Sequence, residues 1–163
     1  MAAVHHLHEL DGIGGVLAHG TFDLLHIGHV RYFKEARKYG SLTVTLTADR
    51  YVRKEPGRPV FPQEMRAEMI AAIRYVDAVA IVPEATALMA IRTVRPAIYV
   101  KGSEYIDVPS DDAVHLEIAE VIRHGGRMIF IERETIYSSS KLLSGEILRA
   151  KQIGEKYEGT MPE

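Results

Sequence analysis

The feature that most constrains the fold of this 163-residue chain is a regular alternation of short apolar runs with segments of helical period. Short apolar runs bounded by glycine or proline predict buried strands, whereas apolar residues three or four positions apart predict amphipathic helices. The predicted strands span 15–20, 42–48, 79–82, 97–100 and 128–131. Five strands that alternate with helices predict an α/β fold with one five-stranded parallel sheet and helices on both faces.

The segments between these strands carry the apolar stripes of the predicted helices. The stripes are Tyr32, Phe33, Ala36 and Tyr39; Met65, Met69, Ala72, Ile73 and Val76; Val114, Ile118, Val121 and Ile122; and Leu143, Ile147 and Ala150. A short helix is expected over about 84–93. We expect a domain at 15–153 between a loosely packed N-terminal extension (1–14) and a C-terminal tail (154–163). We interpret the extension's histidines, at 5, 6 and 8, as solvated rather than metal-binding.

Composition excludes several classes of function. The chain has 22 acidic and 20 basic residues, a net charge of −2, which disfavours a nucleic-acid-binding surface. No apolar run approaches the length of a membrane-spanning helix, and the N-terminus lacks the basic start of a signal peptide. The absence of cysteine excludes disulfides and thiolate chemistry. We therefore expect a cytoplasmic protein without nucleic-acid or membrane partners.

Residues 20–29, Gly-Thr-Phe-Asp-Leu-Leu-His-Ile-Gly-His, follow the first predicted strand and open the first predicted helix. The ligand crevice of a parallel α/β sheet lies at the carboxyl ends of its strands, so this loop should border it. Gly20 would let the backbone approach a phosphate, and the amides of the helix start attract anions. His26 and His29, with Gly28 between them, can point into the same crevice, whereas a metal site has no evident third ligand.

This decapeptide resembles the signature of the HIGH-type nucleotidyltransferases, the cytidylyltransferase-like superfamily, and the resemblance extends over about 15–150. It implies a Rossmann-like domain and an enzyme that transfers a nucleoside monophosphate from a nucleoside triphosphate to a phosphorylated small molecule, with release of pyrophosphate. By resemblance, His26 and His29 are catalytic, because they bind the phosphates and stabilise the transition state, and Asp23 orients the motif. The nucleotide-binding residues that it implies in this loop are Gly20, Thr21, Phe22 and Gly28.

The loop after the second predicted strand is locally basic, with five basic residues against three acidic ones from Asp49 to Arg66. Its position at the predicted crevice favours polyphosphate binding over a merely solvated loop. Lys54 and Arg66 are candidates for the nucleotide, and Arg58 is a weaker candidate for the acceptor.

Two later loops also carry candidate binding residues. Lys101 follows the fourth predicted strand, is expected to pack little, and is a candidate catalytic residue that contacts the acceptor or the α-phosphate. Glu104 and Tyr105 beside it are weaker acceptor candidates. Serine hydroxyls at the start of the last predicted helix would hold the triphosphate in addition to capping the helix. These serines are Ser138, Ser139 and Ser140.

Within the superfamily, loops 54–59, 101–105 and 137–140 are most similar to the adenylyltransferases that make ADP-heptose from heptose 1-phosphate. Thr21, the pair Ser103-Glu104 and the run 138–140 depart from the Cys, Gly-Asp and Ser-Thr-Thr that are more usual there. Segments 20–23 and 73–77 are equally similar to glycerol-3-phosphate cytidylyltransferases. We therefore expect ATP and a heptose 1-phosphate as substrates, with CTP and glycerol 3-phosphate or another alcohol phosphate as the alternative.

The resemblance also implies Mg²⁺ bound with the nucleoside triphosphate and held by few protein ligands. The oligomeric state is left open, and a homodimer is one alternative. A non-catalytic nucleotide-binding domain is the alternative from another class, since it would share the sheet. Such a domain would not need two imidazoles, Lys101 and a serine turn at separate strand ends.

Overall fold

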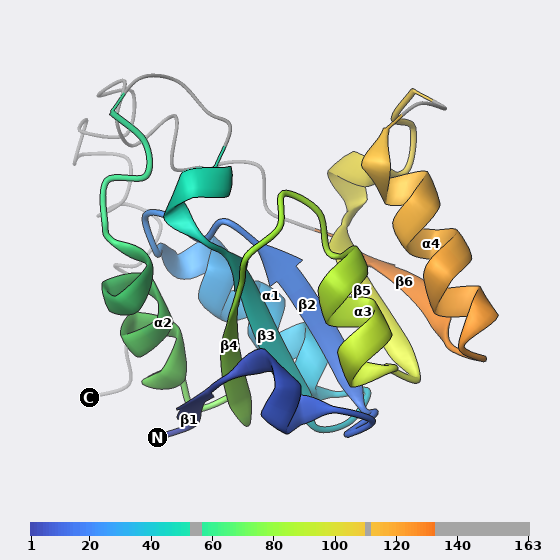
Figure 1. Cartoon of the computed structure of the whole chain (residues 1–163), viewed down its shortest axis with the longest axis horizontal. Coiled ribbons are helices and arrows are strands. Elements are labelled where there is room, and N and C mark those ends of the chain that lie inside the picture. The colour runs from blue at the N-terminus through green and yellow to red at the C-terminus, as the bar shows by residue number, and fades with distance from the viewer. Residues whose placement is uncertain (53–56, 110–111, 133–163) are drawn as a thin grey trace, which may run out of the picture.

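The computed structural model describes residues 1–52, 57–109 and 112–132. They form a six-stranded, entirely parallel sheet with the order β1-β4-β3-β2-β5-β6 (Figure 1). The strands are β1 (Ala3–His5), β2 (Val16–Gly20), β3 (Leu42–Thr47), β4 (Ala78–Val82), β5 (Ile98–Gly102) and β6 (Arg127–Ile131). The strand order reverses at β2, which pairs with β3 on one side and β5 on the other, so the crevice expected for such a sheet lies at the end of β2.

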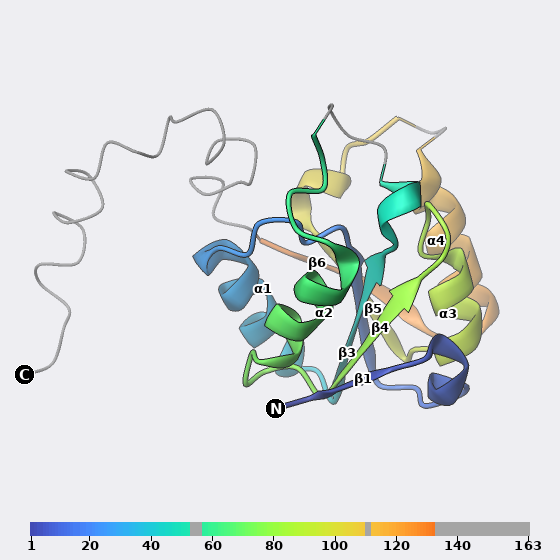
Figure 2. The same ribbon diagram turned by 60° about the vertical axis from the view of Figure 1, so that its left-hand side comes forward.

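Helices cover both faces of this sheet (Figures 1 and 2). On one face lie α1 (Ile27–Arg37) and α2 (Gln63–Ala71), and on the other lie α3 (Leu88–Val94) and α4 (Ala113–Arg123). Three short 3₁₀ helices complete the described elements: η1 (Leu7–Leu10), η2 (Asp49–Tyr51) and η3 (Ser103–Tyr105). Each face has its own apolar core, because alternate residues of a strand point to opposite sides.

The alternation along β2 shows how the two cores are divided. Val16 and Ala18 pack with α1 and α2, whereas Leu17 packs with α3 and α4. His19 has the same parity as Leu17 and therefore faces α3 and α4. Its neighbour β5 follows the same rule, with Val100 in the first core and Tyr99 in the second. Residues at the carboxyl ends of β2 and β5 therefore point to both faces of the sheet.

The sheet has six strands, so the prediction of five is wrong in number while the parallel α/β arrangement is confirmed. The missed strand is β1, whose Ala3 lies opposite Ala78 of β4. It has only three residues and two of them are exposed, so it lacks the apolar run that marks an internal strand. Leu10, which follows in η1, is buried in the core, so this part of the extension packs tightly.

Two predicted helix faces differ from the structure. In α2 the predicted Met65 is exposed, and Arg66 is fully buried instead. In α4 the predicted Ile122 is exposed, and Glu117 is buried. In both helices the buried face contains a polar side chain with hydrogen-bond partners where an apolar residue was expected. The spacing of apolar residues cannot predict such a side chain.

The predicted helix around 143–150 lies outside the described residues. No helix in the ranges that the structure describes is both long and apolar enough to cross a membrane.

Candidate active site

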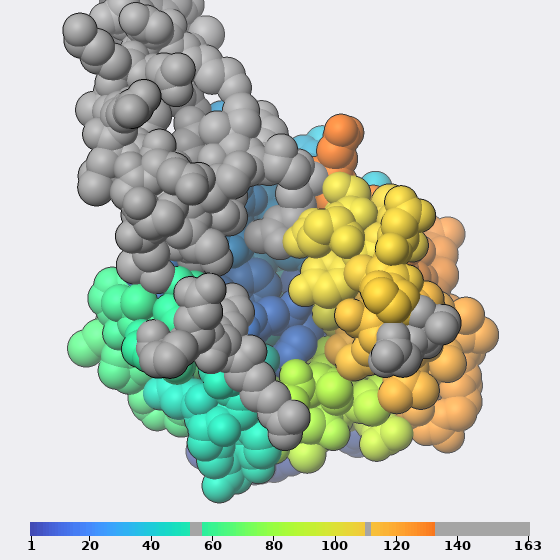
Figure 3. All heavy atoms as spheres, turned by 90° about the horizontal axis from the view of Figure 1, so that it is seen from above, coloured from blue at the N-terminus to red at the C-terminus, as the bar shows by residue number. Residues whose placement is uncertain are grey.

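The carboxyl ends of the strands form one edge of the molecule, and Figure 3 looks onto it. A hollow lies there between the teal and green atoms that follow β3 and the yellow atoms that follow β5, with blue atoms of the N-terminal part at its floor. Most of the predicted site residues that the structure describes come from the loops around this hollow.

The two motif histidines cap the first turn of α1. His26 is the N-cap residue, and its Nδ1 accepts a hydrogen bond from the backbone N–H of Gly28 at 3.1 Å. The backbone N–H of His26 in turn donates to Nδ1 of His29 over 3.4 Å, and the ring centroids lie 3.9 Å apart. Because each Nδ1 is an acceptor, the neutral form of each ring carries its proton on Nε2. The cap thus orients two N–H donors at one helix N-terminus.

Phe22 lies in the loop between β2 and this cap and supports the cap by packing. It is a non-glycine residue with a positive φ of 48°, and its ring is buried against His29 and Phe33. A Cβ on Gly20 would lie 3.1 Å from the Phe22 ring. The structure therefore gives the glycine a reason other than phosphate approach, since a side chain at this position would displace the ring that supports His29.

Asp23 fastens the same loop to the segment before α2. Its Oδ1 accepts hydrogen bonds from the backbone N–H groups of Val60 at 2.7 Å and Phe61 at 3.2 Å. Its Oδ2 lies 2.6 Å from Nε of Arg58, and both side chains are buried. These contacts agree with the orienting role predicted for Asp23. They also turn the predicted acceptor ligand Arg58 inward.

Arg66 is a buried connector between three loops. Its guanidinium donates to the backbone carbonyls of Phe61 and Thr47, at 3.0 and 2.9 Å, and to that of Thr21. It also donates to Oδ1 of Asp49 at 2.6 Å. A guanidinium has five N–H donors, so most of those of Arg66 bind protein acceptors. This geometry supports a positioning role for Arg66, while the predicted contact with the nucleotide stays a prediction.

Lys101 lies on the opposite face of the sheet edge, in a buried polar cluster. Its Nζ is 3.0 Å from Oε2 of Glu117 and 4.5 Å from the centre of the Tyr105 ring. The same Oε2 accepts a hydrogen bond from the Tyr99 hydroxyl at 2.9 Å. The prediction that Lys101 packs little is wrong, because the residue is only 9% exposed. Burial, followed by the charge of Glu117, raises the pKa of Tyr99 well above its usual value, so the phenol stays protonated and donates.

His19 belongs to the same face. Its Nδ1 lies 2.9 Å from Oγ1 of Thr45, and its Nε2 lies 3.2 Å from Oγ1 of Thr47. Burial, with a smaller contribution from the positive charge of Lys101, lowers the pKa of His19 from 6.5 to about 3. His19 is therefore a neutral, hydrogen-bonded histidine at neutral pH.

A contact between α1 and β5 connects the two faces of the sheet edge. Tyr32 donates a hydrogen bond of 2.8 Å to the carbonyl of Val100, the residue that precedes Lys101. His29 is three residues before Tyr32 and shares its side of α1. This contact sets the histidine cap beside the end of β5, so the motif and Lys101 border the same part of the edge.

The remaining predicted residues divide into two groups. Thr21 lies in the loop after β2 and Gly28 in the first turn of α1, whereas Glu104 and Tyr105 lie in η3 after β5, all at the predicted edge. Four other candidates fall outside the described residues, and their roles stay predictions. They are Lys54, Ser138, Ser139 and Ser140.

Three polar residues of the site were missed by the sequence analysis: His19, Tyr99 and Glu117. The signal for His19 was a histidine inside an otherwise apolar strand. The signal for Glu117 was an acidic residue three positions after Val114 and four before Val121, on the buried side of a helix. Both patterns mark a buried polar group that must have a partner elsewhere.

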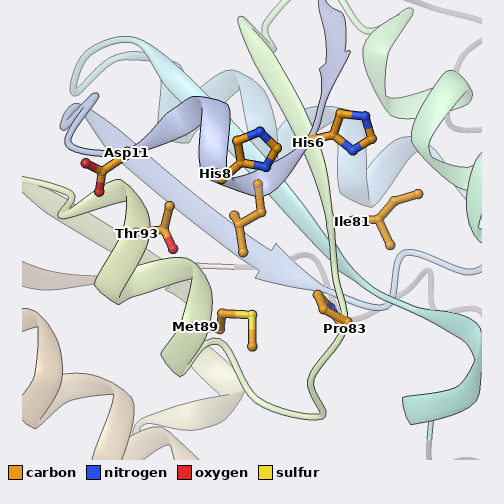
Figure 4. A pocket seen from close by; sticks show the side chains of 8 residues that line it. His6, His8, Asp11, Ile81, Pro83, Met89 and Thr93 are labelled. Atoms are coloured by element: carbon orange, nitrogen blue, oxygen red, sulfur yellow. The ribbon is translucent and has the colours of Figure 1, made fainter.

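A separate cavity of about 710 Å³ lies between η1, the end of β4 and α3 (Figure 4). It is lined by His6, Leu7, His8, Asp11, Ile81, Pro83, Met89 and Thr93. The imidazoles of His6 and His8 stack there, with their centroids 5.6 Å apart. Among the residues with described positions, no cluster of three or more His, Cys, Asp or Glu side chains could hold a metal ion.

A parallel sheet whose central strand ends in a histidine-capped helix start, with a lysine at the neighbouring strand end, is the arrangement expected of a HIGH-type nucleotidyltransferase. The sequence profile of the family described as Cytidylyltransferase-like matches residues 17–150, and the chain belongs to this family. The predicted resemblance is thereby confirmed at the level of the family.

The chain is also similar to several proteins named bifunctional protein HldE. It is 42% identical over 116 residues to the one from Geobacter sulfurreducens, covering 69% of this chain and 23% of the relative. It is 38% identical over 133 residues to the one from Gluconobacter oxydans, covering 80% and 27%. The chain thus spans about a quarter of the length of these relatives.

The fold is also similar to that of a solved structure. It is the lipopolysaccharide core biosynthesis protein from Thermoplasma volcanium, which is 26% identical with a TM-score of 0.60. The match covers 78% of this chain and all of that protein.

Proposed function

We propose that this protein is a nucleotidyltransferase that transfers the adenylyl group of ATP to a heptose 1-phosphate and releases pyrophosphate. The observation that carries the proposal is that adjacent strands β2 and β5 end in the histidine cap of α1 and in Lys101. The family membership and the similarity to the HldE proteins support the reaction class. The likeness to a protein of lipopolysaccharide core biosynthesis supports a sugar phosphate as the acceptor.

In the proposed reaction, an oxygen of the acceptor phosphate attacks the α-phosphorus of the triphosphate, and the bond to pyrophosphate breaks. Such a transfer requires positioning and neutralisation of charge rather than covalent chemistry from the protein. The Nε2–H groups of His26 and His29 donate to phosphate oxygens, and the ammonium of Lys101 neutralises charge on the α-phosphate or the acceptor. Asp23 and Arg66 hold the loop that carries the two histidines.

Mg²⁺ is proposed to enter as the complex with the triphosphate. The carboxylates of Asp23, Asp49 and Glu117 are each paired with an arginine or a lysine, so phosphate oxygens and water are the ligands that suit this ion. The ion supplies charge neutralisation on the phosphates when it is bound.

The test is pyrophosphate release measured with ATP, CTP, GTP or UTP against heptose 1-phosphates, other sugar 1-phosphates and polyol phosphates, each with Mg²⁺. We expect turnover with ATP and a heptose 1-phosphate. The His26→Ala/His29→Ala double variant is the matched control, because a contaminating enzyme would not respond to it. Turnover only with CTP and a polyol phosphate would overturn the substrates, and no turnover with any pair would overturn the reaction class.

A further inference from the structure

Glu117 of α4 is a buried carboxylate that has no role in the reaction as proposed above. The residue is only 2% exposed, and both of its oxygens are engaged. Oε1 accepts a hydrogen bond of 2.9 Å from the backbone N–H of Ala87, just before α3. Oε2 receives the Tyr99 hydroxyl at 2.9 Å and the Lys101 ammonium at 3.0 Å. One side chain therefore joins α4 to the loop after β4 and to the end of β5.

We propose that Glu117 is the positioning residue of Lys101: it holds the ammonium at the end of β5 in the place from which Lys101 contacts the reacting phosphates. The proposal rests on the proposed function, because it gives a role to the candidate lysine of that reaction. It adds a residue from α4 that the sequence motif does not contain.

The surroundings of the pair explain why the carboxylate can hold the lysine in one place. A buried charge is costly unless it is paired and hydrogen-bonded, and Glu117 meets this condition with three donors. Two of these donors do not involve the lysine: Ala87 N–H at the start of α3 and Tyr99 O–H on β5 both bind the carboxylate and fix its position. An ammonium has three N–H donors, so one bond to Glu117 leaves others for phosphate oxygens.

The aromatic neighbours restrict the lysine further. Nζ of Lys101 lies 4.5 Å from the centre of the Tyr105 ring and 5.8 Å from that of Tyr99. A ring face attracts a cation at such distances, so both rings favour the ammonium in this position. Glu117 supplies the directional contact in this cage, and the rings supply a less directional one.

The test is a double-mutant cycle with Glu117→Gln, Lys101→Met and the combined variant, assayed with the substrate pair that turns over. Gln keeps an acceptor for Ala87 and a polar partner for Tyr99, while it removes the negative charge beside Lys101. We expect Glu117→Gln to lower kcat about 10²-fold with little change in KM for the triphosphate. In the Lys101→Met background the same change should cost less than about threefold, because the group through which Glu117 acts is gone.

Tyr99→Phe is the matched control for the cluster. It removes one hydrogen bond to Glu117 but leaves the contact between Glu117 and Lys101, so kcat should fall by less than about fivefold, in line with the loss of one neutral hydrogen bond. Equal losses of kcat from Glu117→Gln in both backgrounds would overturn the proposal, as would a kcat that stays within twofold of the unmodified protein. Glu117→Asp, which withdraws the carboxylate by one methylene, should lower kcat in the same Lys101-dependent way and serves if the Gln variant does not fold.

A second readout does not depend on turnover. The rate at which acetic anhydride acylates Lys101, read by mass spectrometry of peptides, should rise at least threefold in Glu117→Gln and stay unchanged in Tyr99→Phe. The reason is that the contact with the carboxylate engages Nζ, and its loss leaves Nζ freer to meet the reagent. If no substrate pair turns over, the proposed function fails, and this rate still decides whether Glu117 holds Lys101. An unchanged rate in Glu117→Gln would overturn the proposal.

Discussion

The two faces of the sheet edge build their polar groups in different ways. On the face of α1 and α2, the histidine cap comes from one continuous stretch, residues 20–29. It is held by contacts within that stretch, by the bond of Asp23 to Val60 N–H, and by the bond of Arg66 to the carbonyl of Thr21. On the face of α3 and α4, His19, Lys101 and Glu117 come from β2, β5 and α4 and meet only in the folded chain. The sequence predicts the histidine cap of the first face, because its residues are close together in the chain. It does not predict the cluster on the second face, whose residues are far apart in the chain.

The two faces also differ in how amino-acid substitutions affect their hydrogen bonds. The groups around Arg66 are mainly backbone carbonyls, which cannot be removed by substitution and are left without a donor when Arg66 is lost. The groups around Glu117 are side chains, apart from Ala87 N–H, and can be changed one at a time. Variants of Arg66 and of Glu117 therefore separate stability from chemistry.

The largest expected effect is on stability and concerns Arg66→Met. The change keeps most of the aliphatic volume but leaves three buried carbonyl groups without their donor, so the free energy of unfolding should fall by about 3–5 kcal/mol. Urea denaturation measures it. The control is Arg92→Ala, whose guanidinium is more than half exposed in its pair with Glu120 and should cost less than about 1 kcal/mol. Equal losses in the two variants would contradict the connector role of Arg66.

The next effect is on the rate and concerns the cap. His26→Ala and His29→Ala should each lower kcat by about 10²–10³-fold, as expected for the loss of one donor to the transition state. The measurement is pyrophosphate release, with circular dichroism to verify the fold. His115→Ala, an exposed histidine of α4, should leave kcat unchanged. A folded His26 or His29 variant with full activity would remove that residue from the mechanism.

The third prediction concerns acid stability on the opposite face. The pKa of His19 is about 3 in the folded protein, against 6.5 for an ordinary histidine, so the unfolded chain takes up a proton first as the pH falls. Stability is therefore complete above about pH 6.5 and is lost as the pH falls from there towards 3, by about 2 kcal/mol at pH 5. The loss of unfolding free energy between pH 8 and pH 5 should be smaller by that amount in His19→Asn. Identical pH dependences would show that His19 is not the group responsible.

The smallest expected effect is on stability and concerns Gly20 at the end of β2. Gly20→Ala puts a methyl group 3.1 Å from the Phe22 ring, which must then shift by a few tenths of an ångström. We expect a loss of about 1 kcal/mol, at the low end of overpacking effects, measured by thermal denaturation. Gly14→Ala is a useful contrast, because it has a positive φ but nothing within 4 Å of the added Cβ, so its loss comes from backbone strain alone. A Gly20→Ala variant as stable as the unmodified protein would show that the ring is not held tightly.

The alternation of strands and helices, the edge at which the site lies and the histidine cap at 26–29 can all be predicted from the sequence. Each of these follows from residues close together in the chain, where period, capping and turn chemistry act directly. Three other features appear only in the folded chain: β1 joins the sheet, Arg66 is buried, and Glu117 contacts Lys101. The physical reason is that a buried polar group is stable only with its partner, and here the partners lie on separate elements that the fold alone brings together.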